Sequence, residues 1–99
     1  MNVQKKVILV TGGAGGLGAE MVEVLASNKA RVYILDLDSA KGEALAKRIT
    51  EEGFFAAFLK LDLTSEEAWK TTVGLIMERE GRIDVLVNNA GINIRKPIE

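Results

Sequence analysis

The chain has 99 residues, of which 47% are hydrophobic and 27% charged, and its formal net charge is −1. These values describe one small domain with enough apolar side chains for a packed core, and they give no basic field that would favour nucleic acid or an anionic membrane as a partner. The sequence contains neither cysteine nor histidine, which excludes disulfides, thiolate catalysis and the commonest metal ligand.

The apolar runs of the sequence are short. None approaches the ~20 residues that a membrane span requires. The run that follows Lys5 and Lys6 breaks into glycines after four residues, whereas a signal peptide needs a longer apolar core. We therefore expect a cytoplasmic protein without a membrane partner.

Short apolar runs alternate with longer amphipathic segments along the whole chain. The first, second and fourth runs are continuous and rich in β-branched residues, which is typical of strands buried on both faces of a sheet. The third run mixes phenylalanine with alanine, as expected of a strand nearer the edge. The four runs occupy residues 7–10, 32–35, 54–59 and 85–87.

The three segments between the runs have the spacing of amphipathic helices. We expect the first at about 16–28 and the second at about 39–52, while Thr64 and Glu67 form a capping box that would begin a third helix ending at Gly81. Strands and helices that alternate in this way predict a parallel sheet with helices on its faces. The helical positions expected to carry the apolar faces are Leu17, Met21, Val24 and Leu25, then Ala40, Ala44, Leu45 and Ile49, then Ala68, Trp69, Thr72, Val73 and Ile76.

Five of the ten glycines lie in the stretch TGGAGGLG, directly after the first apolar run. Glycines here let the backbone N–H groups at a helix N-terminus approach a pyrophosphate, because a Cβ would hold the anion away or clash. The stretch fits two spacings: Gly13, Gly15 and Gly18 match G-x-G-x-x-G, and Gly12, Gly16 and Gly18 match G-x-x-x-G-x-G. The strand before and the helix after favour a dinucleotide site. A flexible turn without a ligand is the alternative.

Asp36 ends the second run and lies 18 residues after Gly18, close to the ~20 expected for the acidic residue that binds the adenosine ribose of a dinucleotide. Its carboxylate would accept both ribose hydroxyls and repel a 2′-phosphate, and the glycine stretch holds no Arg or Lys to offset that repulsion. NAD is therefore expected as the cofactor in preference to NADP. The alternative is that Asp36 only ends the strand or caps the next helix, a role that Asp38 or Ser39 could fill.

Two further polar groups follow the third and fourth runs, where the carboxyl ends of parallel strands meet. Asp62 could accept a hydrogen bond from the adenine amino group, with Leu63 against the ring, although a turn aspartate is the simpler interpretation. The fourth run ends in NNAG. Two adjacent asparagines are costly to bury unless both amides are bonded, and Gly91 lets a ligand approach. An ordinary turn is the alternative here too.

Together these residues resemble the short-chain dehydrogenase/reductase family, which has a Rossmann-type fold. TGGAGGLG matches the family's T-G-x-x-x-G-x-G, which selects the spacing of Gly12, Gly16 and Gly18, and NNAG matches the motif after the family's fourth strand. The resemblance implies a three-layer α/β/α domain over residues 1–99, with a parallel sheet in the strand order 3-2-1-4 and with Asn89 tying the fourth strand to its neighbours. The cofactor-binding residues that it implies are Gly12, Gly15, Gly16, Leu17, Gly18, Asp36, Leu37, Asp62, Leu63, Asn89, Ala90 and Gly91.

The same resemblance implies a catalytic Ser and a Tyr-x-x-x-Lys pair. The only tyrosine here is Tyr33, and Leu37 stands four residues later. We therefore expect the N-terminal, NAD-binding half of an oxidoreductase, with no catalytic residue among these 99 and no turnover by this chain alone. In such a half the fourth strand is an open edge, which favours a homo-oligomer through that strand or the uncovered sheet face. A stand-alone dinucleotide-binding module and a self-associating structural module are the alternatives.

Overall fold

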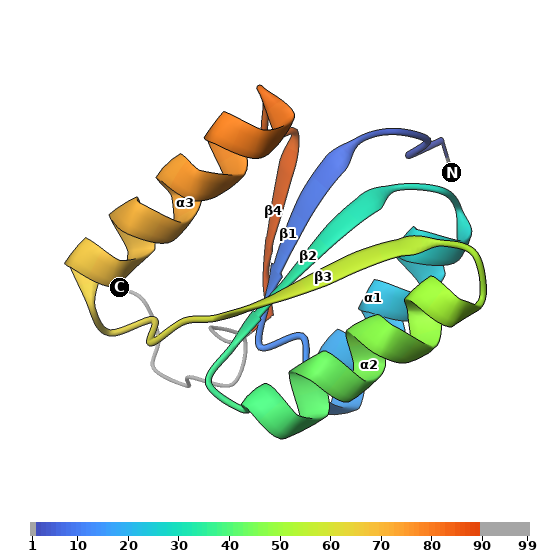
Figure 1. Cartoon of the computed structure of the whole chain (residues 1–99), viewed down its shortest axis with the longest axis horizontal. Coiled ribbons are helices and arrows are strands. Elements are labelled where there is room, and N and C mark those ends of the chain that lie inside the picture. The colour runs from blue at the N-terminus through green and yellow to red at the C-terminus, as the bar shows by residue number, and fades with distance from the viewer. Residues whose placement is uncertain (1, 90–99) are drawn as a thin grey trace, which may run out of the picture.

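The computed structural model describes residues 2–89, and in that part of the chain four parallel strands alternate with three helices (Figure 1). The strands are β1 (Val7–Thr11), β2 (Arg31–Asp36), β3 (Phe55–Lys60) and β4 (Val85–Asn88), and the helices are α1 (Gly16–Ser27), α2 (Ser39–Glu51) and α3 (Glu66–Glu80). The sheet has the order β3-β2-β1-β4, and each neighbouring pair is parallel. The predicted α/β fold and strand order are thus confirmed.

Helices lie on both faces of the sheet. Figure 1 shows α1 and α2 on one face and α3 on the other. All of β1 and the four central residues of β2 are buried, as their continuous apolar runs predicted. β3 lies at one edge of the sheet, which confirms the expectation drawn from its mixture of phenylalanine and alanine.

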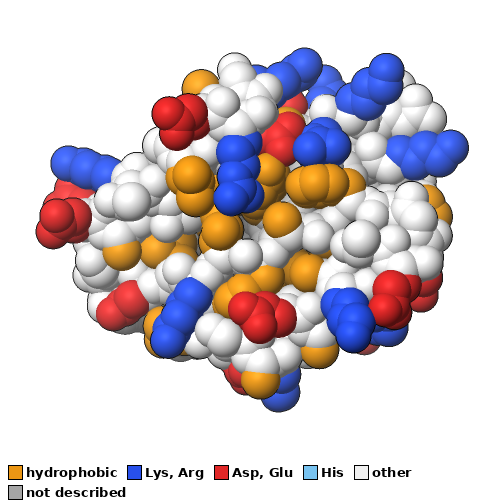
Figure 2. Space-filling view, in the orientation of Figure 1, with side chains coloured by type: hydrophobic (Ala, Val, Ile, Leu, Met, Phe, Trp, Pro, Cys, Tyr) orange, Lys and Arg blue, Asp and Glu red, His pale blue; other side chains and the backbone are white. Residues whose placement is uncertain are grey.

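The surface carries charges of both signs. On the face seen in Figure 2, acidic and basic side chains are interspersed around a band of hydrophobic side chains that follows the line of β3 between α3 and α2. Basic side chains gather at the upper right of this view, and acidic and basic side chains alternate over the rest of the face. Within residues 2–89, no helix combines the length and the apolar character needed to cross a bilayer.

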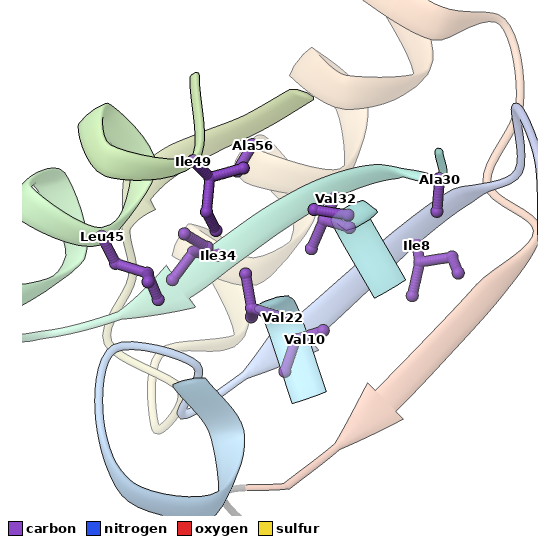
Figure 3. Close-up of a cluster of buried hydrophobic side chains, with 10 residues drawn as sticks. Ile8, Val10, Val22, Ala30, Val32, Ile34, Leu45, Ile49 and Ala56 are labelled. Carbon is purple, nitrogen blue, oxygen red and sulfur yellow. The ribbon is translucent and has the colours of Figure 1, made fainter. Parts of the chain in front are cut away.

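The core is divided into two layers by the sheet. Ile8 and Val10 of β1 belong to the cluster on the side of α1 and α2, where Val10 lies beside Val22 of α1 and Ile8 lies nearer to Val32 of β2 (Figure 3). The residues that alternate with them point the other way, into a smaller cluster beneath α3. Its buried members are Val7, Leu9, Tyr33, Leu35, Leu61 and Ile76.

The buried face of α1 differs from the expected one. Its buried residues are Gly18, Val22 and Ala26, whereas Leu17 is 58% exposed and Val24 51% exposed. The reason is the close approach of α1 to the sheet, which places Gly18 and Ala26 at the contact together with Val22 and leaves Leu17 and Val24 beside β4 and solvent. The apolar stripe chosen from helical spacing was therefore wrong at Leu17 and Val24, whereas Met21 and Leu25 are half-buried and Leu25 packs against the core.

The inward face of α2 was also only partly predicted. Leu45 and Ile49 are buried as expected, but Ala40 and Ala44 are exposed, and Gly42 is buried instead. A Cβ on Gly42 would lie 2.2 Å from the ring of Phe58, so this glycine lets α2 pack directly on β3.

Helix α3 begins with a different cap from the predicted one. The Ser65 side chain accepts a hydrogen bond from the N–H of Ala68 at 3.1 Å and is the N-cap. The Thr64 hydroxyl donates instead to Asp62 Oδ1, so the proposed capping box of Thr64 and Glu67 was wrong. Among the five residues expected on the apolar face of α3, Ile76 is buried and the other four are half-buried.

Strand β4 is more exposed than its sequence pattern predicted. Val85 is 41% exposed and Leu86 47% exposed, although both belong to a run typical of a strand buried on two faces. β4 pairs with β1 along one edge, and within the described residues no strand lies along its other edge.

Candidate functional site

The backbone of the glycine-rich turn distinguishes the two glycine spacings. Gly12 and Gly16 have φ angles of 65° and 57°, in the left-handed region that favours glycine. A Cβ on Gly18 would lie 2.1 Å from the Gly12 carbonyl oxygen. By contrast, Gly15 is extended at φ −152°, a conformation open to any residue. The structure therefore requires glycine at positions 12, 16 and 18, the spacing that the family resemblance selects.

The turn leads directly into α1, and no side chain caps the N-terminus of this helix. Gly15 is the N-cap and makes no side-chain cap, and the first turn of α1 contains no acidic residue. The first N–H groups of an α-helix have no partner within the helix, and they lie at the positive end of its dipole. This arrangement can bind a phosphate group.

Asp36 connects this turn to the end of β2. Its Oδ2 accepts a hydrogen bond from the N–H of Ala14 at 3.0 Å, and its Oδ1 accepts one from the N–H of Asp38 at 3.0 Å. Asp36 thus has the strand-end role considered as an alternative, and Asp38 is the N-cap of α2. A carboxylate has about four acceptor positions, so Asp36 can still accept further hydrogen bonds from a ligand.

A pocket of ≈ 240 Å³ opens beside Asp36. Sites for whole ligands generally exceed ~300 Å³, so this pocket suits one part of a larger molecule. Five of the sequence-predicted site residues line this pocket, and among them are two apolar and two acidic side chains. The lining residues are Gly12, Asp36, Leu37, Leu61, Asp62, Leu63 and Thr64.

Asp62 has a structural role within this pocket wall. Its Oδ1 accepts hydrogen bonds from the Thr64 N–H at 2.9 Å and from the Thr64 hydroxyl at 2.6 Å. These bonds lower the pKa of the Asp62 carboxyl and keep it ionised. The geometry is that of a turn aspartate, which was the simpler interpretation, and it leaves Oδ2 outside these two bonds.

The end of β4 is tied to the glycine turn. The buried Asn89 donates from Nδ2 to the Gly12 carbonyl oxygen at 3.0 Å, as its expected tying role requires. Thr11 was missed by the sequence reasoning: this buried hydroxyl donates to Asn88 Oδ1 at 3.0 Å and joins β1 to β4. The sequence feature that could have indicated this role is Thr11 itself, the first residue of TGGAGGLG. The predicted site residues Ala90 and Gly91 lie outside the described residues.

Tyr33 is not part of this site. The side chain is buried in the cluster beneath α3, and its hydroxyl donates to the Glu80 carboxylate. Burial and the bond to Glu80 raise the pKa of Tyr33. Within residues 2–89, no three acidic side chains gather as a metal site either. The Tyr33 hydroxyl is therefore engaged beneath α3, apart from the glycine-rich turn.

A parallel sheet in this strand order, with a glycine turn after β1 and a carboxylate at the end of β2, defines a Rossmann-type dinucleotide-binding fold. The sequence model of the short chain dehydrogenase family matches residues 6–99. The chain therefore belongs to this family of oxidoreductases, whose members bind nicotinamide dinucleotides.

Individual relatives agree with this assignment. The chain is 44% identical over 97 residues to an uncharacterized oxidoreductase of Bacillus subtilis (strain 168), and 46% identical over 103 residues to the trans-4-hydroxycyclohexanecarboxylate dehydrogenase of Sinomonas cyclohexanicum. Each alignment covers 98% of this chain, but 38% and 40% of the relatives. The chain thus spans about two-fifths of the length of these curated relatives.

Solved structures show the same likeness. A metagenomic short-chain oxidoreductase in complex with NADP has a TM-score of 0.86 and 34% identity, over 92% of this chain and 41% of that one. A citronellol catabolism dehydrogenase of Pseudomonas aeruginosa has a TM-score of 0.85 and 34% identity, over 88% of this chain and 36% of that one.

Proposed function

We propose that this chain forms, as one domain, the part of an NAD-dependent short-chain oxidoreductase that binds the adenosine and pyrophosphate of its cofactor. The observation that carries the proposal is the turn from Gly12 to Gly18, where the left-handed φ angles of Gly12 and Gly16 and the close contact of Gly18 with the Gly12 carbonyl favour glycine at all three positions. The backbone there suits a diphosphate at the N-terminus of α1, with Gly16, Leu17 and Gly18 supplying the first amides.

Asp36 would bind the adenosine ribose. Each of its oxygens already accepts one backbone N–H, which fixes the carboxylate while leaving acceptor positions for the ribose diol. A fixed carboxylate repels a 2′-phosphate, and this supports NAD as the preferred cofactor. Because one structural relative binds NADP, the preference has to be measured.

The pocket beside Asp36 would hold the adenine. Leu37 and Leu63 are exposed side chains on its wall, and apolar side chains of this kind pack against the faces of a heterocycle. Asp62 is ionised and has an oxygen left to accept from the adenine amino group. We expect Asn89, with Ala90 and Gly91 beyond it, to lie beside the second ribose.

The nicotinamide would supply the hydride chemistry when the cofactor is bound, while the residues described above would bind the adenosine and pyrophosphate of the same molecule. Tyr33 is buried and bonded to Glu80, so it cannot exchange a proton with a substrate at this site. We accordingly propose that residues 1–99 bind the dinucleotide without turning over a substrate on their own.

Calorimetric titration with NAD, NADP and ADP-ribose tests this proposal. We expect NAD and ADP-ribose to bind with similar affinity, because both contain the adenosine and pyrophosphate that the site would contact. Gly16→Trp should abolish binding by filling the phosphate position. The proposal fails if NAD and ADP-ribose give no heat and shift no backbone amide between Gly12 and Gly18.

A pair of aspartate variants isolates the role of Asp36. Asp36→Asn removes the charge that a ribose diol prefers, and we expect NAD affinity to fall roughly tenfold, the effect of one charge-assisted hydrogen bond. Asp38→Asn makes the same change of net charge two residues away and keeps a good N-cap for α2. Equal losses in the two variants would contradict a specific contact with Asp36.

A second candidate function is self-association through β4, and the exposed edge of this strand favours it. The edge-strand residues Val85 and Leu86 are apolar and more than two-fifths exposed, and beside them Leu17, Val24 and Val87 line an apolar groove of ≈ 340 Å³. An uncharged edge of this kind tends to pair with another strand.

Light scattering across a range of protein concentrations tests the second candidate. We expect the parent chain to form dimers or larger species at high concentration and Leu86→Lys to reduce them. A monodisperse monomer for the parent chain at high concentration would overturn the self-association candidate without affecting nucleotide binding.

A further inference from the structure

The fold places a lysine beside the glycine-rich turn. Lys41 belongs to the first turn of α2, well beyond the turn in sequence. A Cβ built on Gly15 would lie 3.9 Å from both Cδ and Nζ of Lys41. The ammonium group therefore stands next to the turn itself, although the turn contains no basic residue of its own.

This ammonium group is available to a ligand. Lys41 lines a surface pocket of ≈ 380 Å³ between α1 and α2, together with Ala14 and Arg48. Arg48 is engaged in an ion pair with Glu23. Lys41, by contrast, has no ion pair within residues 2–89, so its charge is not neutralised by a neighbouring side chain in that part of the chain.

The carboxylate of Asp36 and the ammonium of Lys41 flank one short piece of backbone. Asp36 bonds to the N–H of Ala14 at 3.0 Å, and Lys41 lies beside the next residue, Gly15. Ala14 also lines the Lys41 pocket, while Asp36 lines the pocket that would hold the adenine. A ribose bound by Asp36 would therefore sit between the two pockets, and a group on its 2′-oxygen would come close to Lys41.

We propose that Lys41 is a specificity-determining residue: its ammonium group binds the 2′-phosphate of NADP and offsets the repulsion by Asp36, so that the site accepts NADP as well as NAD. This inference rests on the proposed dinucleotide site. The glycine turn by itself predicts strong discrimination against NADP, because it contains no cation. A cation supplied by α2 makes that discrimination small.

A charge reversal on α2 with a matched control tests the role of Lys41. Lys41→Glu places an acidic residue in the first turn of a helix, where the helix dipole favours it, so the fold should be retained. Lys47→Glu makes the same change of net charge at an exposed position of the same helix. Calorimetric titration of the parent chain and both variants with NAD and with NADP gives the ratio of the two dissociation constants.

For the parent chain we expect NADP to bind within roughly tenfold of NAD. In Lys41→Glu, NADP affinity should fall by roughly tenfold or more and NAD affinity by less than about twofold, because only the 2′-phosphate meets the reversed charge. The loss should shrink as salt is added, and Lys47→Glu should leave the ratio unchanged. Equal losses of NAD and NADP would place Lys41 at the pyrophosphate and overturn the inference.

The test separates this inference from the proposed function. If NAD binds to the parent chain and Lys41→Glu leaves the ratio of NADP to NAD affinity unchanged, the role of Lys41 is wrong and the dinucleotide site stands. If neither NAD nor NADP binds to the parent chain, both the proposed function and the role of Lys41 are overturned.

Discussion

Replacement of Gly18 by alanine places a Cβ atom 2.1 Å from the Gly12 carbonyl oxygen and 2.7 Å from Asn89 Nδ2. Ordinary contact begins at 3.4 Å, so the helix or the turn has to move by more than about 1 Å. No flexible side chain can absorb this movement at Gly12, because the contact there is with backbone. The same shift disturbs the 3.0 Å hydrogen bond from Asn89 to Gly12. Gly18→Ala therefore acts on the packing of α1 and on the attachment of β4 together.

The steric clash and the disturbed hydrogen bond together determine how far the free energy of unfolding should fall. Overpacking in a core costs about 1–3 kcal/mol, and a buried polar group that loses its partner costs about 1–3 kcal/mol more. We expect the free energy of unfolding to fall by roughly 2–6 kcal/mol, out of the about 5–15 kcal/mol typical of small domains. Urea unfolding followed by the fluorescence of Trp69, the one tryptophan in the chain, should show a lower midpoint with an unchanged slope.

Gly74 provides a matched control in α3. A Cβ added at Gly74 meets no atom within 4 Å, and alanine is the better helix former by up to about 1 kcal/mol. The midpoint of Gly74→Ala should therefore rise while that of Gly18→Ala falls. A Gly18→Ala chain within about 0.5 kcal/mol of the parent, the range of neutral surface substitutions, would refute the close contact between α1 and the turn.

Two further predictions concern α3. Glu80 accepts two hydrogen bonds from Arg31 and one from Tyr33, so Glu80→Gln should lower the free energy of urea unfolding by about 1–3 kcal/mol. The Arg31 bonds hold the pKa of Glu80 below its ordinary 4.5; the carboxylate thus stabilises the fold fully above that value, and this contribution is lost as the pH falls through the lower folded-state pKa. Glu80→Gln should flatten that acid-side decline, and an equally steep profile would contradict the assignment. Ser65→Ala should cost about 1 kcal/mol as an N-cap loss, and Thr64→Ala should cost less; the reverse order in urea unfolding would restore the predicted capping box.

The parts of the fold that could be predicted from sequence depend on local pattern. Continuous β-branched runs identified β1 and β2 because these strands are buried on both faces. The position of Asp36 relative to the glycines was sufficient to place a carboxylate at the turn, because the length of one strand–helix–strand unit varies little. The bond from Asn89 to Gly12 also followed the motif.

The parts that could not be predicted depend on distances between elements. The apolar residues of α1 formed a convincing stripe through Leu17 and Val24, but the face that packs on the sheet contains Gly18 and Ala26 together with Val22. The spacing of apolar residues along one helix does not reveal how closely that helix packs on the sheet. Lys41 was missed for the same reason, because only the packing of α2 beside the turn reveals which cation the turn acquires.

The hydrogen bond between Asn89 and Gly12 joins residues that are 77 positions apart, and this has a consequence for biosynthesis. Ribosomes add about 5–20 residues per second, so roughly 4–15 s separate the synthesis of the two partners. During that interval β1 can pair with β2 on one side, while its other side and the Gly12 carbonyl await β4. Nascent chains arrested before residue 89 should therefore capture immobilised ADP-ribose poorly, and capture should improve once Asn89 has left the exit tunnel.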